Sequence, residues 1–196
     1  MNNKHRLTTV GIGASIVIIC AAFYGCQRER ANTHRLGHVP EQLAVSKILY
    51  AKEKAYGFGP GGNEAGVIVY ALSEEVATEI ARTGLDFFKQ FPPQSTYDRH
   101  WQGKYREWQE TPLISDPDWH DDWDDELEAT DTVLAAPLPK LENYLYRYGF
   151  GIEVNPDIEQ EINSAISTSG SYFAYGRLGM LLVMPEAQKI VYVHSG

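Results

Sequence analysis

The sequence predicts an α+β fold, in which a small, mainly antiparallel sheet of about four strands is covered by about four helices, behind an N-terminal membrane-anchor helix. Short runs rich in β-branched residues, bounded by Gly and Pro, predict the strands. Apolar residues that recur at helical spacing after capping residues predict the helices. The last two strands are joined by a short turn into a terminal hairpin, so the sheet is expected to be antiparallel there.

The first 26 residues predict an export or anchoring segment. Residues 7–24 carry no formal charge and are rich in Ile, Val, Ala and Gly, and Lys4 and Arg6 precede them. At about 1.5 Å per residue, such a helix reaches roughly 27 Å, which is enough to cross the hydrocarbon core of a bilayer. Basic residues on the N-terminal side favour a cytoplasmic N-terminus and an extracytoplasmic, periplasmic domain.

Three fates of this segment remain open: an uncleaved single-pass anchor, a signal peptide whose cleavage leaves a lipidated Cys26, and a plain cleaved signal peptide. The run Phe23-Tyr24-Gly25-Cys26 resembles the lipobox of bacterial lipoproteins, in which a small residue precedes the cysteine. This resemblance implies that Cys26 is a lipidation site. Cys20 and Cys26 are the two cysteines of the chain, so no disulfide framework is expected to hold the domain that follows.

After the anchor we expect a polar stalk over residues 27–39 and one domain over residues 40–196, because a chain of this length makes one domain of ordinary size. A helix is predicted over residues 40–56, where apolar side chains recur at helical spacing and Gly57 follows as a stop. A Gly-rich loop then leads to a buried, β-branched strand over residues 66–72.

A second helix is predicted over residues 73–89, with Ser73 as its N-cap and acids in its first turn. Residues 94–137 show little periodicity and hold all four tryptophans, which predicts a functional insertion or a long loop. Capping residues and β-branched runs predict the remaining elements, which are helices over 139–148 and 155–170 and strands over 150–154, 172–184 and 190–194.

The formal charge of −9 lies in one part of the chain. Residues 1–26 sum to +2, residues 27–115 to zero and residues 132–196 to −2. The remaining sixteen residues, 116–131, hold nine acids and no base, and we call them the acidic tract. Because no basic surplus exists to displace counterions from phosphates, nucleic-acid binding is not expected.

The acidic tract and its tryptophans allow four interpretations. Clustered carboxylates are the ligands that Ca²⁺ requires, but the tract lacks the glycine and the closing glutamate of an EF-hand. Carboxylates beside aromatic side chains are also typical of polysaccharide hydrolases. A solvated helix start, with Trp119 and Trp123 packed on the domain, requires no function. A recognition surface for a basic protein is the fourth interpretation, because Trp anchors interfaces and charge of one sign steers an opposite partner.

We take the recognition surface as the main hypothesis. The candidate partner-binding residues are the tryptophans and aspartates of this region: Trp101, Trp108, Asp116, Asp118, Trp119, Asp121, Asp122, Trp123, Asp124 and Asp125. The predicted function is a membrane-tethered, extracytoplasmic binding protein that holds a basic protein partner, in the manner of an acidic immunity protein that neutralises a cationic toxin. The alternative is a cell-envelope polysaccharide hydrolase that uses carboxylates of residues 116–128.

The other motifs predict no further chemistry. Residues 57–62 match a Gly-x-Gly-x-x-Gly pattern, but the predicted order of helix, loop and strand reverses that of a dinucleotide-binding unit, and Pro60 removes one N–H donor. His34 and His38 have the spacing of a metal pair on a helix, but we expect both to be solvated in the stalk. We therefore predict no cofactor, no metal and no nucleotide.

Overall fold

The computed structural model describes residues 26, 29–56, 63–92, 102–114, 116–120, 138–149 and 151–196. The chain divides into two compact units, Met1–Leu36 and Gly37–Gly196. In the first unit, residues 29–36 are helical and Cys26 is exposed. The helix predicted over residues 7–24 lies outside the described residues. Of the helices that the structure does describe, none is long and apolar enough to cross a bilayer.

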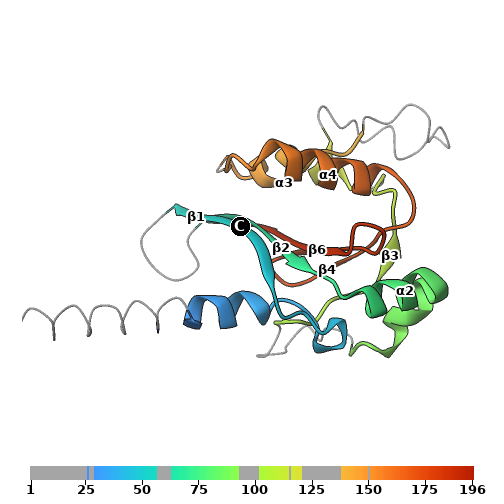
Figure 1. The fold of residues 1–196 in the computed structure, drawn as a ribbon. Coiled ribbons are helices and arrows are strands. Elements are labelled where there is room, and N and C mark those ends of the chain that lie inside the picture. Colours follow the sequence, from blue (N-terminus) through green and yellow to red (C-terminus); the bar gives the residue numbers. More distant parts are fainter. Residues whose placement is uncertain are drawn as a thin grey trace, which may run out of the picture. The chain divides into compact units, whose positions relative to one another are not determined.

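The second unit is an α+β domain built on one antiparallel sheet (Figure 1). The strand order is β1-β2-β6-β5-β4-β3, and every neighbouring pair is antiparallel. The strands are β1 (Ile48–Tyr56), β2 (Asn63–Ala71), β3 (Gln109–Glu110), β4 (Tyr172–Tyr175), β5 (Gly179–Met184) and β6 (Lys189–Ser195). The predicted class is confirmed, but the predicted number of about four strands is wrong because the described residues form six.

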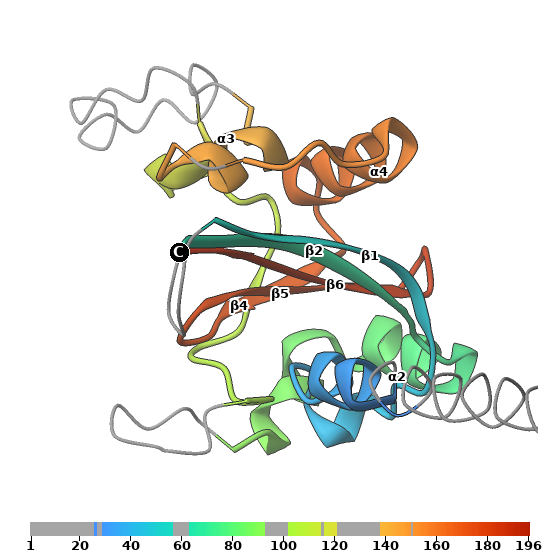
Figure 2. The same ribbon diagram turned by 90° about the vertical axis from the view of Figure 1, so that its left-hand side faces the viewer.

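Helices cover both faces of this sheet (Figure 2). One face packs against α3 (Leu141–Tyr146) and α4 (Pro156–Ser167), and the other lies over α2 (Glu74–Thr83) and the 3₁₀-helix η2 (Gly84–Gln90). All six residues of β5 are buried, because side chains on both of its faces meet a helical layer. Such a strand appears in the sequence as a continuous apolar run without alternation.

The helix predicted over residues 40–56 is wrong. This region contains the short 3₁₀-helix η1 (Glu41–Leu43), and then β1, which pairs along its length with β2. Tyr50 and Tyr56 share one face of β1 and pack on the core. The apolar residues fit a helical and a strand pattern equally poorly, and the pairing with β2 decides between them. Charged side chains at Lys52, Glu53 and Lys54 suit this edge strand.

Three other boundaries also differ from the prediction. The strand predicted over residues 172–184 is two strands, because residues 176–179 form a turn in which the Gly176 N–H donates to the Gly179 carbonyl at 2.7 Å. The described residues 151–154 form no strand. The helix predicted over residues 73–89 is α-helical only to Thr83 and continues as η2 from Gly84. Its predicted cap is confirmed, since Ser73 Oγ accepts from the Val76 N–H at 3.3 Å.

Candidate functional site

Trp119 fixes the start of the acidic tract on the domain. It ends the 3₁₀-helix η3 (Pro117–Trp119), which Asp116 caps by accepting from the Asp118 N–H at 3.0 Å. The Trp119 side chain is fully buried, and its ring stacks on Tyr144 with centroids 4.4 Å apart. The core surrounds this side chain in the folded domain, and partner contact by Trp119 stays an untested prediction. The interpretation that it packs on the domain is confirmed.

Described residues on the two sides of the segment 121–137 are joined by hydrogen bonds to the Trp119 carbonyl. The Lys140 N–H donates to the Trp119 carbonyl at 2.6 Å, and the Asn143 side-chain amide donates to the same oxygen at 3.3 Å. The Leu141 N–H in turn donates to Asn163 Oδ1 of α4 at 2.7 Å. Residues 121–137 themselves lie outside the described residues, between His120 and Leu138. Seven of the nine acids of the tract belong to the segment that these hydrogen-bonded residues flank.

A polar pocket of about 590 Å³ opens beside η3, at the end of the sheet, and we call it the strand-end pocket. Its walls come from the start of β2, the end of β6, the turn between β4 and β5, η3 and the end of α3. Its charged and titratable lining residues are Glu64, Arg106, Asp116, Asp118, Tyr144, Arg147, Tyr148, Tyr175, Arg177 and His194. Asp116 and Asp118 are the two predicted site residues that it contains.

Arg147 is held rigidly in the wall of this pocket. Its guanidinium lies over the rings of Tyr144 and Tyr148, at 4.3 and 4.7 Å from their centroids. One Nη donates to Asp118 Oδ2 at 2.6 Å, and the other donates to the Ser195 carbonyl at 2.8 Å. Asp118 is therefore already paired within the domain.

Asp116 is also engaged. The Tyr175 hydroxyl donates to Asp116 Oδ2 and accepts from Trp119 Nε1 at 2.9 Å. Burial raises the pKa of Tyr175, and the hydrogen bond to the Asp116 carboxylate raises it further. These contacts connect the cap of η3, the indole of Trp119 and strand β4 in one network.

A glycine allows His194 to lie across the sheet at the pocket edge. His194 of β6 pairs in register with Gly66 of β2 on one side and Gly179 of β5 on the other. A Cβ atom on Gly66 would lie 2.2 Å from His194 Nε2 and 2.9 Å from Glu53 Cγ. Because Gly66 has no side chain, His194 Nε2 reaches to 3.8 Å from the Glu53 carboxylate.

Buried tyrosines are expected to make the domain sensitive to alkali. Burial raises the pKa of Tyr144 to about 12, although the nearby Arg147 charge opposes this shift. The unfolded chain ionises this group at about pH 10, so its contribution is complete below pH 10 and is lost as the pH rises towards 12. We expect the free energy of unfolding to fall over this range, as measured by urea denaturation at stepped pH. The fall should be shallower in Tyr144→Phe, and an equal fall in that variant would contradict the assignment.

Trp108 lines an apolar cleft of about 710 Å³ beside η2. Its ring stacks on Phe88 with centroids 4.1 Å apart and meets Phe91 edge to face. The indole is half-buried, so part of it is accessible from this cleft. Partner contact by Trp108 stays a prediction.

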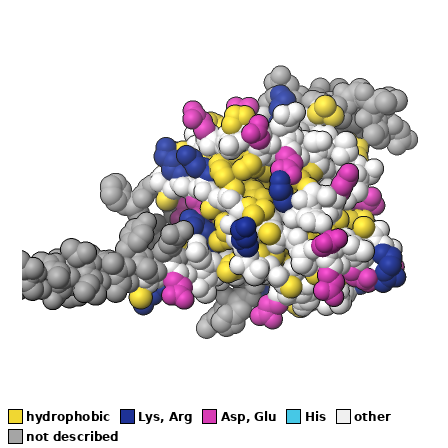
Figure 3. Space-filling model, in the orientation of Figure 1, with side chains coloured by type: hydrophobic (Ala, Val, Ile, Leu, Met, Phe, Trp, Pro, Cys, Tyr) yellow, Lys and Arg dark blue, Asp and Glu magenta, His cyan; other side chains and the backbone are white. Residues whose placement is uncertain are grey.

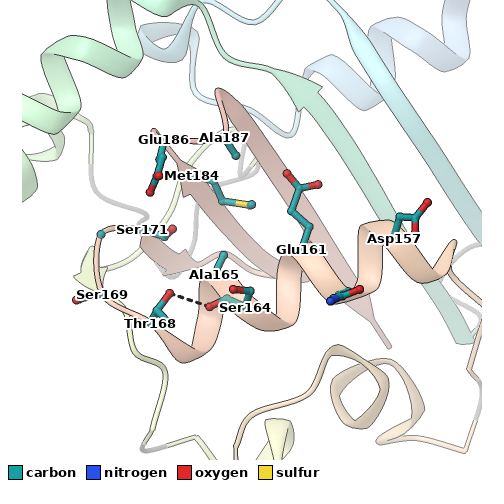
Figure 4. Close-up of a pocket in the computed structure, with 12 residues that line it drawn as sticks. Asp157, Glu161, Ser164, Ala165, Thr168, Ser169, Ser171, Met184, Glu186 and Ala187 are labelled. Carbon is teal, nitrogen blue, oxygen red and sulfur yellow. Dashed lines mark hydrogen bonds between the residues drawn. The ribbon is translucent and has the colours of Figure 1, made fainter.

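A third hollow of about 580 Å³ runs along α4 (Figure 4). Asp157, Glu161, Ser164 and Thr168 line it from the helix side, and Glu186 lies opposite in the turn between β5 and β6. Lys189 Nζ lies 2.7 Å from both oxygens of Glu161. Asp157 and Glu186 form no ion pair with other described residues, so this groove presents acids and hydroxyl groups to solvent.

The remaining predicted site residues lie outside the described residues: Trp101, Asp121, Asp122, Trp123, Asp124 and Asp125. His38, which was expected to be solvated, is instead buried in the second unit, and its ring stacks on Tyr192 with centroids 4.3 Å apart. Within the described residues, no group of three or more His, Cys, Asp or Glu side chains is placed to hold a metal ion.

Comparison of the chain with protein-family models, curated proteins and solved structures found no match.

Proposed function

We propose that this protein is a membrane-tethered, extracytoplasmic binding protein that holds a basic protein partner through the acidic tract, in the manner of an acidic immunity protein. The observation that carries the proposal is the junction at Trp119. It joins described residues on the two sides of a segment that contains seven of the nine acids of the tract. Negative charge concentrated in one segment of the chain steers an oppositely charged protein toward that segment.

The charge distribution outside the acidic tract also supports the proposal. Outside the acidic tract, the charges of the chain sum to zero. On the face drawn in Figure 3, basic side chains lie among acidic ones. A balanced scaffold with one charged region favours a partner that docks at that region. The groove along α4 adds Asp157 and Glu186, two carboxylates without an ion pair among the described residues, and these suit Lys or Arg side chains of the same partner.

The membrane tether in this proposal is residues 7–24, retained as a helix or replaced by a lipid on Cys26 after cleavage. Mass spectrometry of the intact N-terminus distinguishes the outcomes. A chain that begins at Cys26 and carries the added mass of a lipid supports the lipoprotein form. A chain that still begins at Met1 supports the uncleaved anchor. A mature chain that begins after residue 26 without a lipid contradicts the tether.

Partner binding tests the role of the acidic tract. Affinity capture from membranes with the full chain identifies a partner, and its association rate is then measured at increasing salt. Replacing Asp121, Asp122, Asp124 and Asp125 with Asn is expected to lower the association rate about tenfold at low salt, because steering depends on these charges. The difference should vanish at high salt, where charges are screened.

A matched variant removes four exposed acids elsewhere. Glu41→Gln, Glu74→Gln, Glu75→Gln and Asp86→Asn change the net charge equally, at η1, α2 and η2. This variant should keep most of the association rate. Equal losses in the two variants would show that net charge, and not the acidic tract, drives binding. No observation favours the hydrolase over binding, since the Asp116 and Asp118 carboxylates are already engaged within the domain.

A further inference from the structure

We propose that the strand-end pocket binds a small organic anion that carries a carboxylate or phosphate group. This inference goes beyond the binding of a basic protein, because it concerns a different ligand and different side chains. Three arginines from separate parts of the chain line this pocket: Arg106 before β3, Arg147 after α3 and Arg177 in the turn between β4 and β5. Guanidinium groups bind carboxylate and phosphate oxygens through paired N–H donors.

Two of these arginines are available to a ligand. Arg106 and Arg177 are exposed, and neither guanidinium forms an ion pair or hydrogen bond with the residues that the structure describes. Two acids of the same lining contact other side chains, since Asp118 pairs with Arg147 and Asp116 accepts from the Tyr175 hydroxyl. Glu64 and Asp116 also place negative charge in this lining, so Arg106 and Arg177 would hold an anion through their unbonded N–H donors and not through a net positive charge.

The Arg147 guanidinium is a fixed, positively charged part of the pocket wall. Its buried Nε has no hydrogen-bond partner among the described residues, although both Nη atoms are bonded. A buried N–H without an acceptor is destabilising. Stacking between Tyr144 and Tyr148 keeps the guanidinium in place before a ligand arrives, which reduces the entropy lost on binding.

The acids in the pocket wall limit the size and charge of the ligand. Glu64, Asp116 and Asp118 bring three negative charges to the same lining as the three arginines. A polyanion such as nucleic acid would meet these carboxylates as well as the net charge of −9. A pocket of about 590 Å³ instead accommodates a small molecule, with its anionic group against the arginines and its polar part near Glu64 and His194.

The test is a titration of the full-length ¹⁵N-labelled chain, in detergent, with sodium phosphate and separately with sodium acetate. Sodium chloride keeps the ionic strength constant. We expect the amide signals of Arg177 and Gly179 to shift with saturation. A response to phosphate alone assigns a phosphate group, a response to acetate alone assigns a carboxylate, and responses to both assign a site for either. Shifts that merely match those in sodium chloride overturn the proposal.

Variants locate the site. Arg106→Gln with Arg177→Gln is expected to weaken binding of the responding anion at least about tenfold, because two charge-assisted donors are lost. The matched control is Arg82→Gln with Lys52→Gln, which removes two exposed positive charges from α2 and β1. The control should bind as the unchanged protein does. Equal weakening in both double variants would overturn the proposal, because it would show a response to net charge alone.

Discussion

Replacing Trp119 with alanine is expected to lower the free energy of unfolding by about 3–5 kcal/mol, the range for removing a large buried aromatic side chain. The indole is fully buried, stacks on Tyr144 and donates to Tyr175. Alanine would leave a cavity between η3 and α3 and would leave the Tyr175 hydroxyl without its donor. Urea denaturation followed by far-ultraviolet circular dichroism measures the loss without relying on tryptophan fluorescence.

Two further variants separate the causes. Trp119→Phe keeps a stacked ring but loses the Nε1 donor, so it should cost less than alanine. Leu138→Ala removes an exposed side chain at the other end of the segment 121–137, and it should change stability by less than about 0.5 kcal/mol. A loss below about 1 kcal/mol in Trp119→Ala would contradict the role assigned to this side chain.

The environment of Trp119 could not be predicted from the local sequence alone. Acids beside tryptophans indicate both a recognition surface and a helix start packed on the domain, and the spacing of the residues does not distinguish them. Trp119 packs on the domain because it contacts Tyr144 and Tyr175, which follow it by 25 and 56 positions along the chain. Local patterns carry no information on such distant contacts. The caps of α2 and α4 were predictable, because Ser73 and Asn155 act within three residues of themselves.

Pairing between distant strands explains the errors in the predicted fold. Residues 40–56 form an edge strand because β2 offers them a partner, and their own sequence is ambiguous. The run 172–184 contains Gly176 and Gly179, which mark its turn, but burial on both faces makes it appear as one apolar strand. The strand-end pocket had no local signal either, because its three arginines come from separate segments.

Replacing Gly179 with alanine is expected to lower the free energy of unfolding by about 3 kcal/mol. A Cβ atom at this position would lie 2.2 Å from the Val193 carbonyl oxygen and 2.9 Å from His194 Cβ. The carbonyl belongs to the backbone of β6, so it cannot swing away as a side chain does. Relief of the contact requires β5 and β6 to separate where Gly179 pairs with His194, and such overpacking typically costs 1–3 kcal/mol.

Gly66→Ala is the matched contrast, because Gly66 faces His194 from the opposite neighbouring strand. Its added Cβ would meet His194 Nε2 and Glu53 Cγ, which are side-chain atoms that can move. We therefore expect a smaller loss, with the His194 ring displaced from Glu53 and its NMR signals shifted. His194→Ala should reduce the cost of Gly66→Ala but leave most of the cost of Gly179→Ala, because the Val193 carbonyl remains in place. Equal losses in the two glycine variants would show that side-chain crowding, and not the backbone of β6, limits this part of the sheet.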